Sequence, residues 1–438
     1  MHKLYIYLSS FSLCFCIEIK ILAQKPDLYG DTTSNKLEKK IYHVVSDAIH
    51  HQAFPGCVVY ASHRDSIMFF KSYGYHTYDS LIPVKKDDIY DLASITKIVG
   101  ATLALMKLYE EGLIMLDNPI KNYVEGLEGR VGKITMREAL AHQAGLQPWI
   151  PYHKIIRKRN GHFRQKDIIT ESKDGYSFEI TDSLYLNNQF YKRRIKELIK
   201  KSKVKKNPLY QYSGLFFYLV PEIVLNLTGI SFEEYLKTEF YFPLEVQSLG
   251  FNPKKEFSLN RIPPTEIDTF FRMEAIHGKV HDEGAIMMGG VSGNAGLFSN
   301  AEDLASVMAF LMDYGKTDSL SLLSPQTINL FTCSHYSSQG NRRGLGFDKP
   351  LLSYDSLLSS VAKSTSFRSF GHTGYTGTLA WADPENDLIF IFLSNRVYPS
   401  RDNKALYQLN VRPMIHQILY DYLEARKIKK SLPVLIGN

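Results

Sequence analysis

Strand-like segments lie near both ends of this chain, and helix-like segments fill the middle. Near the N-terminus, residues 56–62 and 66–75 are β-branched or aromatic runs separated by a three-residue turn, which predicts a hairpin. Near the C-terminus, residues 376–383 and 387–395 predict two strands joined by a Pro-Glu-Asn turn. The most economical architecture is one α/β domain built from both ends, with a mainly helical region inserted between them.

Six segments between and after these strands have helical sequence patterns. In residues 89–112 the helical periodicity begins after Ser94, and Gly112 is a natural C-terminal stop. Thr135 and Ser231 stand where N-cap residues begin two of the later helices. The other predicted helices cover residues 135–141, 213–229, 231–240, 302–314 and 411–427.

These patterns place the domain boundaries. A length of 438 residues suits two or three structural units. We predict a discontinuous sheet domain at residues 24–93 and 290–438 and a mainly helical domain at residues 94–289. The expected fold class is therefore α+β, with an antiparallel sheet flanked by helices and a helical domain beside it.

The positive charge of the chain is concentrated in one stretch. The whole chain has 52 Lys+Arg and 45 Asp+Glu, a net of +7, whereas residues 151–206 have 16 and 6, a net of +10. The remainder is then 7 − 10 = −3. We interpret 151–206 as a surface excursion or lid that steers anionic substrates. Nucleic-acid binding has only this charge in its favour, since interleaved aromatic residues are sparse and no known module is present.

The first 23 residues have the pattern of a secretory signal peptide. A basic start precedes an apolar run at residues 4–17, and Ala23 offers a cleavage point. We therefore expect a periplasmic or secreted protein. Lipid attachment at Cys14 or Cys16 is less favoured, because a bulky residue precedes each cysteine. No other segment is long and apolar enough to span a bilayer.

Cysteine and histidine usage gives no sign of a metal centre or cofactor. Outside the leader only Cys57 and Cys333 remain, which leaves a single disulfide open and excludes a disulfide framework. The adjacent residues His281, Asp282 and Glu283 are metal-binding types, but three neighbours in sequence rarely face one ion. We expect neither a metal nor a cofactor.

Ser94 and Lys97 form the first pattern that suggests catalysis. Three residues apart at a helix start, they share one face, where a lysine of lowered pKa can remove the serine proton. The pattern alone is weak, because it recurs at Ser202/Lys205 and Ser360/Lys363, which read as solvated surface. Ser94 by itself also fits an ordinary N-cap.

Two further motifs follow along the chain. Tyr212-Ser213-Gly214 precedes a predicted helix, and a tyrosine near positive charge can relay a proton, although a packed tyrosine is the ordinary alternative. His372, Thr373 and Gly374, followed by Tyr375, form a glycine-punctuated edge strand that a substrate could approach closely. The alternative for this segment is a glycine-rich turn in which the histidine ring makes its hydrogen bonds within the protein.

Together, in this order and spacing, the three motifs resemble those of the serine β-lactamase and penicillin-binding-protein superfamily. The closer likeness is to its class C-like branch of D-alanyl-D-alanine carboxypeptidases and esterases. Segments 112–124, 134–146, 281–305 and 343–350 are also similar to that branch, and the likeness extends from about residue 40 to residue 425. It implies a β-lactamase/transpeptidase-like fold with the site between sheet and helical domain.

The resemblance also implies a role for each motif. Ser94 would be the acylated nucleophile, Lys97 its proton acceptor and Tyr212 a shared base and acid. The backbone N–H groups of Ser94 and Tyr375 would form the oxyanion hole. His372 and Thr373, with Gly374 and the Tyr375 turn, would bind a substrate carboxylate. If His372 must be protonated for this, activity on acidic substrates should fall above about pH 6.5.

One departure bears on the substrate. Gly214 stands where many relatives have an asparagine, so a side-chain amide that could hold a substrate amide is missing. We therefore expect an exported serine hydrolase that forms an acyl-enzyme on a peptidoglycan-derived peptide, a D-amino-acid peptide or an ester. The alternatives are a β-lactamase, which Gly214 disfavours, and a non-catalytic penicillin-binding-like sensor. His142 we expect to be a structural turn residue.

Overall fold

A five-stranded antiparallel sheet is built from the two ends of the chain. The computed structural model describes residues 32–158, 160, 162–206, 208–317 and 320–431; the predicted leader at 1–23 lies outside them. The strand order is β11-β12-β13-β1-β2. The bounds are Gly56–His63 (β1), Ser66–Gly74 (β2), Phe370–Thr373 (β11), Leu379–Asp383 (β12) and Leu388–Ser394 (β13).

The pairing of β1 with β13 joins the two ends in register. Cys57 lies opposite Ser394, and His63 lies opposite Leu388, while β1 forms the predicted hairpin with β2. Every residue of β13 is buried, as a central strand with both faces covered requires. The predicted hairpin and the two C-terminal strands are thus confirmed within a residue or two at each end, except that β12 begins three residues late.

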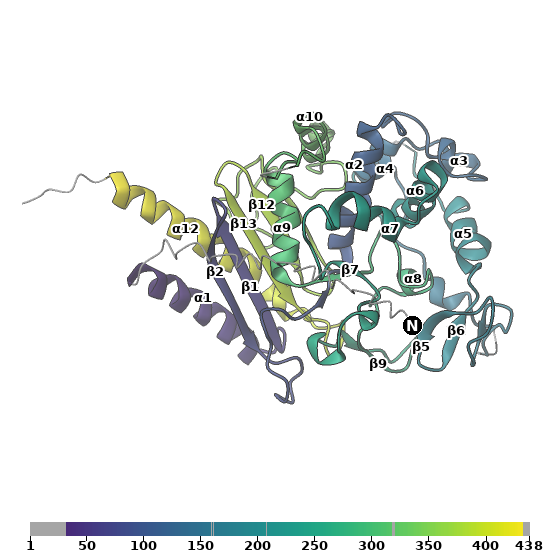
Figure 1. The fold of residues 1–438 in the computed structure, drawn as a ribbon, viewed down its shortest axis with the longest axis horizontal. Helices are drawn as coiled ribbons and strands as arrows, with labels where there is room; N and C mark the ends of the chain where they lie inside the picture. Colours follow the sequence, from purple (N-terminus) through teal and green to yellow (C-terminus); the bar gives the residue numbers. More distant parts are fainter. Residues whose placement is uncertain (1–31, 159, 161, 207, 318–319, 432–438) are drawn as a thin grey trace, which may run out of the picture.

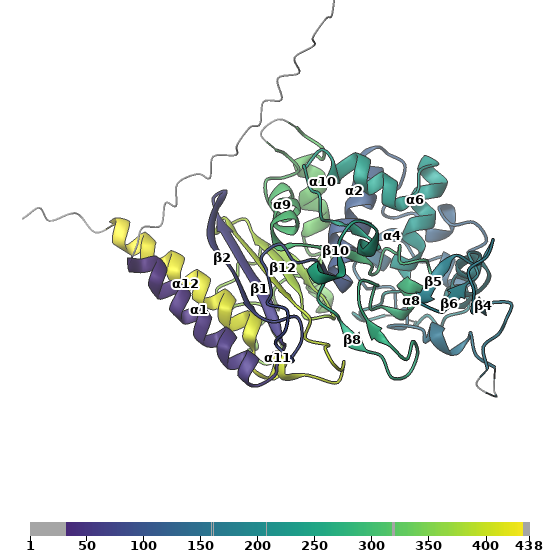
Figure 2. The ribbon, with the colours of Figure 1, turned by 60° about the horizontal axis from the view of Figure 1, so that its bottom comes forward.

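Helices cover both faces of this sheet. The first and last helices, α1 (Thr32–His50) and α12 (Val411–Ser431), run side by side over one face (Figure 2). Between them and the sheet lies a core that includes Phe54, Trp381 and Phe392. Helix α9 (Ala301–Met312) packs against β12 and β13 on the other face (Figure 1). The sheet is therefore the middle layer of three.

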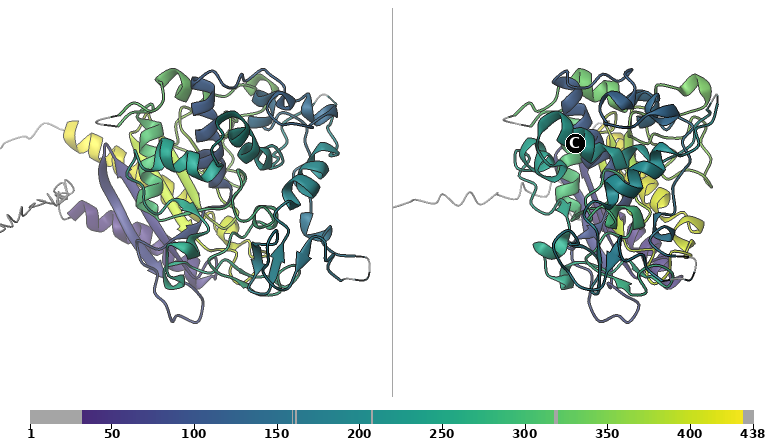
Figure 3. Two further views of the ribbon diagram at one scale, coloured as in Figure 1. Left: turned by 45° about the vertical axis from the view of Figure 1, so that its right-hand side comes forward. Right: turned by 90° about the vertical axis from the view of Figure 1, so that its right-hand side faces the viewer.

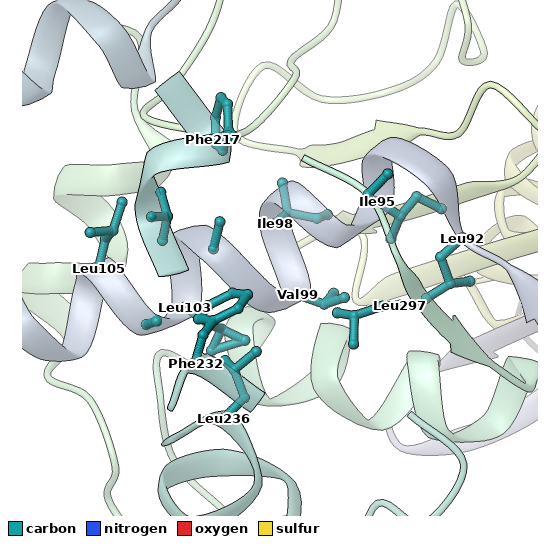
Figure 4. Packing of buried hydrophobic residues seen from close by; sticks show 14 of the residues in the cluster. Leu92, Ile95, Ile98, Val99, Leu103, Leu105, Phe217, Phe232, Leu236 and Leu297 are labelled. Carbon is teal, nitrogen blue, oxygen red and sulfur yellow. The ribbon is translucent and has the colours of Figure 1, made fainter. Parts of the chain in front are cut away.

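The second and larger core surrounds the helix that follows Ser94. A π-helical turn, Lys97–Thr102, continues into α2 (Leu103–Glu110), and all of its residues from Lys97 to Met106 are buried. Figure 4 shows Ile98, Val99 and Leu103 of this helix packed among Phe217, Phe232, Leu236 and Leu297 from later segments. The helix ends before Gly112, whose φ of +73° suits glycine, so the predicted helix is confirmed.

Most of the other predicted helices are also confirmed. In α4 (Met136–Leu140) Thr135 and Glu138 form a capping box, and Ser231 caps α7 (Phe232–Leu236). Several helices were not predicted, and the longest of these are α1 and α10 (Pro325–Thr332). The remaining helices are α3 (Gly129–Gly132), α5 (Lys196–Lys200), α6 (Val220–Thr228), α8 (Glu283–Ile286) and α11 (Ala405–Gln408). The remaining short strands are β3 (Tyr90–Asp91), β4 (Ile168–Ile169), β5 (Phe178–Thr181), β6 (Leu184–Leu186), β7 (Gly250–Phe251), β8 (Glu266–Ile267), β9 (Ala275–Ile276) and β10 (Leu297–Ser299).

The basic stretch 151–206 is not the surface excursion that its composition suggested. It folds into a small sheet of order β4-β6-β5 followed by α5, on the side of the molecule away from the five-stranded sheet (Figures 1 and 3). Its scattered apolar side chains, including Ile180, Leu186 and Ile199, are fully buried in the larger core. Single apolar residues between charged ones therefore anchor this segment, and its cationic side chains lie around them.

The structure also bears on the two cysteines, on possible metal ligands and on membrane-spanning helices. Cys57 is buried and Cys333 is exposed, and both are free thiols. Among the described residues no cluster of three or more potential ligands could hold a metal ion. Within the same part of the chain, no single helix is both long and apolar enough to cross a membrane.

Candidate active site

A strained turn presents Ser94 at the head of the buried helix. Ala93, just before it, has a φ of +46°, a left-handed value that costs a non-glycine residue on the order of 1–3 kcal/mol. The Ala93 N–H donates to one carboxylate oxygen of Asp91 at 2.8 Å, and the His281 N–H donates to the other at 2.7 Å. Burial of Asp91 raises the pKa of its carboxyl group. The Asp91 side chain thus clamps the turn that positions Ser94.

Lys97 and Tyr212 both contact the Ser94 hydroxyl. The Lys97 Nζ lies 2.9 Å from Ser94 Oγ and donates to the Asn294 backbone carbonyl at 2.7 Å. The Tyr212 hydroxyl lies 3.0 Å from the same Oγ. Lys97 is 2% exposed, so it meets the hydroxyl away from water. A nucleophile and two proton-transfer groups therefore lie within hydrogen-bond reach of one another.

The ring of Tyr212 is surrounded by two cations and two imidazoles. The Arg343 guanidinium lies 5.0 Å from the ring centroid and the Lys97 ammonium 5.5 Å. The rings of His142 and His372 lie 4.4 and 5.9 Å from that of Tyr212. Burial, together with Arg343 and Lys97, lowers the pKa of both histidines. The two imidazoles are therefore neutral, and the Arg343 guanidinium supplies positive charge next to Tyr212.

His142 belongs to the side chains that surround Tyr212 and not to the group formed by Ser94, Lys97 and Tyr212. It has a φ of +54° at the end of α4, and its Nδ1 accepts the Ser213 backbone N–H at 3.2 Å. The imidazole thus fixes the peptide next to Tyr212. This geometry matches the structural turn role expected from the sequence.

The predicted titration of His372 near pH 6.5 is wrong. Burial, reinforced by Arg343 and Lys97, lowers the pKa of His372 to about 3. Its Nδ1–H donates to its neighbour's carbonyl, Thr373 O, at 2.7 Å, and its Nε2 accepts from Arg343 Nη1 at 3.0 Å. Both ring nitrogens are engaged, so no imidazole N–H is left for a substrate.

Arg343 provides the positive charge that the sequence led us to expect from a protonated His372. It is 6% exposed and forms an ion pair with Asp348 at 3.2 Å. Its Nε is buried and has no hydrogen-bond partner in the part of the chain that the structure describes. Arg343 and Asn294 were not predicted as site residues, although both lie within segments, 343–350 and 281–305, that carry the family resemblance. A buried arginine beside two histidines can be found only from the fold.

The loop after β11 is tied to the residues that precede Ser94. The hydroxyls of Thr376 and Thr378 donate to the carbonyls of Asp91 and Leu92, at 2.7 and 3.3 Å. A Cβ on Gly374 would meet Thr378 Oγ1 at 2.0 Å and Leu92 O at 2.6 Å, so only glycine fits there. These contacts hold the backbone of Tyr375 next to the Ser94 turn.

Tyr375 is fixed from its outer side as well. The Arg396 guanidinium donates twice to the Tyr375 carbonyl, at 2.9 and 2.6 Å. The Tyr375 ring stacks on His281 and is 45% exposed, and Thr373 is partly exposed beside it. The loop therefore offers a rigid backbone and an aromatic surface to a bound molecule.

Gly214 leaves space at the position where the family resemblance implies an asparagine side chain. A Cβ at this position would have Asn294 Cβ as its nearest neighbour, at an ordinary contact distance of 3.9 Å. The missing amide is therefore a matter of residue choice and not of crowding. Nothing in the backbone at Gly214 requires glycine.

The other candidates from the sequence do not assemble into sites. Lys205 and Lys363, the partners of the two other Ser-x-x-Lys patterns, are exposed. His281 bonds Glu266, Asp282 caps α8, and Glu283 pairs with Arg401, so these three side chains have separate partners. Their apparent metal motif is therefore not formed.

Comparison with known proteins places this geometry in a family. The sequence model of the Beta-lactamase family matches residues 41–412. A protein of Escherichia coli O157:H7 named "Putative D-alanyl-D-alanine carboxypeptidase" is 30% identical over 78% of this chain and 79% of its own.

Two solved structures share the fold. The hydrolase EstCE1, described as having promiscuous acyltransferase activity, has a TM-score of 0.61 and 19% identity, covering 87% of this chain and 99% of that one. A penicillin-binding protein homologue from Caulobacter crescentus has a TM-score of 0.60 and 19% identity, covering 88% and 97%. Because the family model spans most of the chain, this protein belongs to the β-lactamase family of serine hydrolases.

Proposed function

We propose that the protein is an exported serine hydrolase that forms an acyl-enzyme at Ser94. The observation that carries the proposal is the convergence of Lys97 Nζ and Tyr212 hydroxyl on Ser94 Oγ, at 2.9 and 3.0 Å. A binding protein has no need for a nucleophile coupled to two proton-transfer groups. Its substrate is a peptidoglycan-derived peptide, a D-amino-acid peptide or an ester.

Acylation begins with the Ser94 hydroxyl. Its oxygen attacks the substrate carbonyl carbon as its proton passes to Lys97 in its free-amine form or to Tyr212 in its phenolate form, both within reach. The same pair returns a proton to the leaving amine or alcohol when the tetrahedral intermediate collapses. A water then attacks the acyl-enzyme with the same groups as its base, which releases the acid and restores Ser94.

The negative charge that develops on the substrate oxygen needs donors. The backbone N–H groups of Ser94 and Tyr375 are our candidates, because the Thr376 and Thr378 hydroxyls hold the two segments together. Since these contacts exist before substrate binds, the donors need little rearrangement in the transition state.

Arg343 supports a substrate with a free carboxylate. Its charge lies next to His372 and Tyr212, and its buried Nε has no hydrogen-bond partner among the described residues. The partly exposed Thr373 supplies a hydroxyl on the same strand. A C-terminal D-amino acid presents such a carboxylate next to its scissile amide bond. In this proposal His372 is a positioning residue that orients Arg343.

Labelling with an activity-based probe tests the mechanism. A fluorescent fluorophosphonate should label the mature protein, and Ser94→Ala should abolish labelling. Ser202→Ala is the matched control, because Ser202 also belongs to a Ser-x-x-Lys pattern. Equal labelling of the parent and Ser94→Ala proteins would contradict an acyl-enzyme at Ser94.

Turnover separates a hydrolase from a sensor. The protein should release product from a chromogenic ester, and D-alanine from a D-alanyl-D-alanine peptide, over many cycles per molecule. A burst of one equivalent followed by no turnover would indicate a penicillin-binding-like sensor. Efficient β-lactam hydrolysis is not expected, because Gly214 offers no amide to the lactam side chain.

Export is the remaining part of the proposal. The leader pattern at residues 1–23 predicts that the mature chain begins at Gln24. N-terminal sequencing of the protein recovered outside the cytoplasm of a bacterial host should find Gln24. An uncut chain retained in the cytoplasm would contradict export.

A further inference from the structure

A cavity of about 220 Å³ lies between the C-terminal part of α9, α10 and β11. None of the residues that line it belongs to the candidate active site. Its walls are mostly apolar, its lining contains no acidic side chain, and two cationic side chains face it. The lining residues used below are Leu311, Ile328, Lys349, Arg368 and Phe370.

Lys349 is the unusual member of this lining. Its side chain is 8% exposed, and its Nζ donates to the Ser369 backbone carbonyl at 3.0 Å. An ammonium group has three N–H donors, and among the described residues no carboxylate forms an ion pair with this one. Burying a charge without a counter-ion is unfavourable, and burial lowers the pKa of Lys349 to about 8.

The two carboxylates that act electrostatically on Lys349, those of Asp348 and Asp383, are engaged with other partners. Asp348 pairs with Arg342 and Arg343. Asp383 accepts hydrogen bonds from Ser366, Asn386 and Tyr420. Neither carboxylate can neutralise Lys349 without breaking these contacts. The charge of Lys349 therefore faces a cavity that contains no protein anion.

Arg368 adds a second cation at the open side. It is exposed and donates through Nη2 to the Tyr314 hydroxyl at 2.6 Å. The lining also contains the buried apolar side chains of Leu311, Ile328 and Phe370. A lining that combines two cationic side chains with buried apolar ones suits an amphiphilic anion.

The volume limits the size of such a ligand. A cavity of about 150 Å³ in a protein interior holds a benzene molecule. The 220 Å³ here thus accommodates one ring, or a short alkyl chain, with a carboxylate attached.

We propose that this cavity, which we call the Lys349 cavity, is a second binding site, for a small aryl or alkyl monocarboxylate. The carboxylate bridges the Lys349 ammonium and the Arg368 guanidinium, and the apolar body packs against Leu311, Ile328 and Phe370. This site is independent of the proposed chemistry at Ser94.

A titration with 4-fluorophenylacetate, followed by ¹⁹F NMR on the mature protein, tests the site. We expect saturable binding to the parent protein and at least about tenfold weaker binding to Lys349→Met, since a charge-assisted bond is removed. The matched control is Lys363→Met, which removes an exposed lysine outside the cavity. It should bind as the parent does. Arg368→Met should also weaken binding of the acid. Because the Arg368 side chain is exposed, this variant tests the site even if Lys349→Met folds poorly.

A neutral analogue and an active-site variant complete the test. The alcohol 2-(4-fluorophenyl)ethanol has the same ring without the charge and should bind far more weakly than the acid. Equal binding of acid and alcohol, or no binding of the acid at millimolar concentration, would overturn the proposal. So would binding that Arg343→Met removes while Lys349→Met and Arg368→Met retain it, because the acid would then occupy the candidate active site.

Discussion

The Tyr212 hydroxyl lies 3.0 Å from Ser94 Oγ across a sequence separation of 118 residues. Two folded segments must therefore be in place before the serine has both of its proton-transfer partners. Lys97 comes with Ser94 on one helix, whereas Tyr212 is held by Ser213, whose N–H bonds the ring of His142. The Tyr212 hydroxyl should consequently be removable without disturbing the Ser94–Lys97 pair.

Tyr212→Phe keeps the ring and removes only the hydroxyl. We expect kcat for ester hydrolysis to fall by about 10²–10⁴-fold, the usual contribution of general acid–base catalysis, with KM nearly unchanged. Tyr210→Phe is the control, since Tyr210 is a neighbouring tyrosine that also lies near Arg343. A fall of less than about threefold in kcat for Tyr212→Phe would remove Tyr212 from the proton pathway.

The pH profile should contain no ionisation of His372. With its pKa lowered to about 3, the imidazole is neutral throughout the range from pH 5 to pH 8. The kcat/KM profiles of the parent and of His372→Gln should therefore have the same inflections, although their heights differ. An inflection near pH 6.5 that disappears in His372→Gln would restore the charged role that the sequence suggested.

Arg343→Met should change which substrates are preferred. Loss of the guanidinium should raise KM for a peptide with a free C-terminal carboxylate by about tenfold or more, and change KM for its C-terminal amide far less. Arg342→Met is the matched control, because Arg342 also pairs with Asp348 but, within the described part of the chain, forms no hydrogen bond with Tyr212 or His372. Equal effects of Arg343→Met on acid and amide would argue against carboxylate recognition.

Gly214→Asn should increase reactivity toward penicillins. The position has room for a side chain, and the new amide could hold the amide of a lactam substrate. We expect the second-order rate of acylation by a fluorescent penicillin to rise severalfold, while ester hydrolysis is largely retained. Gly214→Ala, which adds the Cβ alone, is the control. A rise of the same size in Gly214→Ala would assign the effect to backbone stiffening.

The buried His416 should make the protein less stable in mild acid. Its ring packs between Phe390 and Tyr420, and burial lowers its pKa to about 3. Between pH 6.5 and pH 3 the unfolded chain binds a proton at this histidine that the folded protein does not. The free energy of unfolding therefore decreases as the pH falls, by at most about 1.4 kcal/mol per pH unit from this group.

Urea denaturation at several pH values checks this slope. His416→Gln should reduce the change in unfolding free energy between pH 7 and pH 5, whatever its effect at pH 7. The exposed His50, changed to Gln, is the control and should leave the slope as it is. An unaltered slope in His416→Gln would show that the imidazole is not kept neutral in the folded state.

Local patterns predicted the parts of the site that are local in sequence. Ser94 and Lys97 share one helix, and the Tyr212 and His372 motifs each occupy a few adjacent residues, so their order and spacing sufficed. Arg343 was missed because an arginine in a loop looks like any surface cation until folding buries it. The charge of His372 was misjudged for the same reason, since its pKa depends on burial and on two distant cations.

In the fold, too, some missed features had a local sequence signal and others depend on contacts distant in sequence. Helix α1 was overlooked, although Leu37, Ile41 and Val45 recur every four residues and are buried. That periodicity was a usable signal. The stretch 151–206 was misread because its buried residues occur singly among lysines and arginines, so no apolar run marks them. Core positions of this kind are defined by partners elsewhere in the chain.

The sheet that joins both ends of the chain governs the order in which the protein can fold. Strand β1 has its partner β2 at once, but β13, on its other side, is synthesised more than 300 residues later, as the pairing of Cys57 with Ser394 requires. Pairings so distant in sequence form slowly and leave apolar strands uncovered meanwhile. A chain that stops before Phe370 would contain Ser94, Lys97 and Tyr212 yet lack three of the five strands and helix α12. Synthesis of nearly the whole polypeptide therefore has to precede formation of a working enzyme.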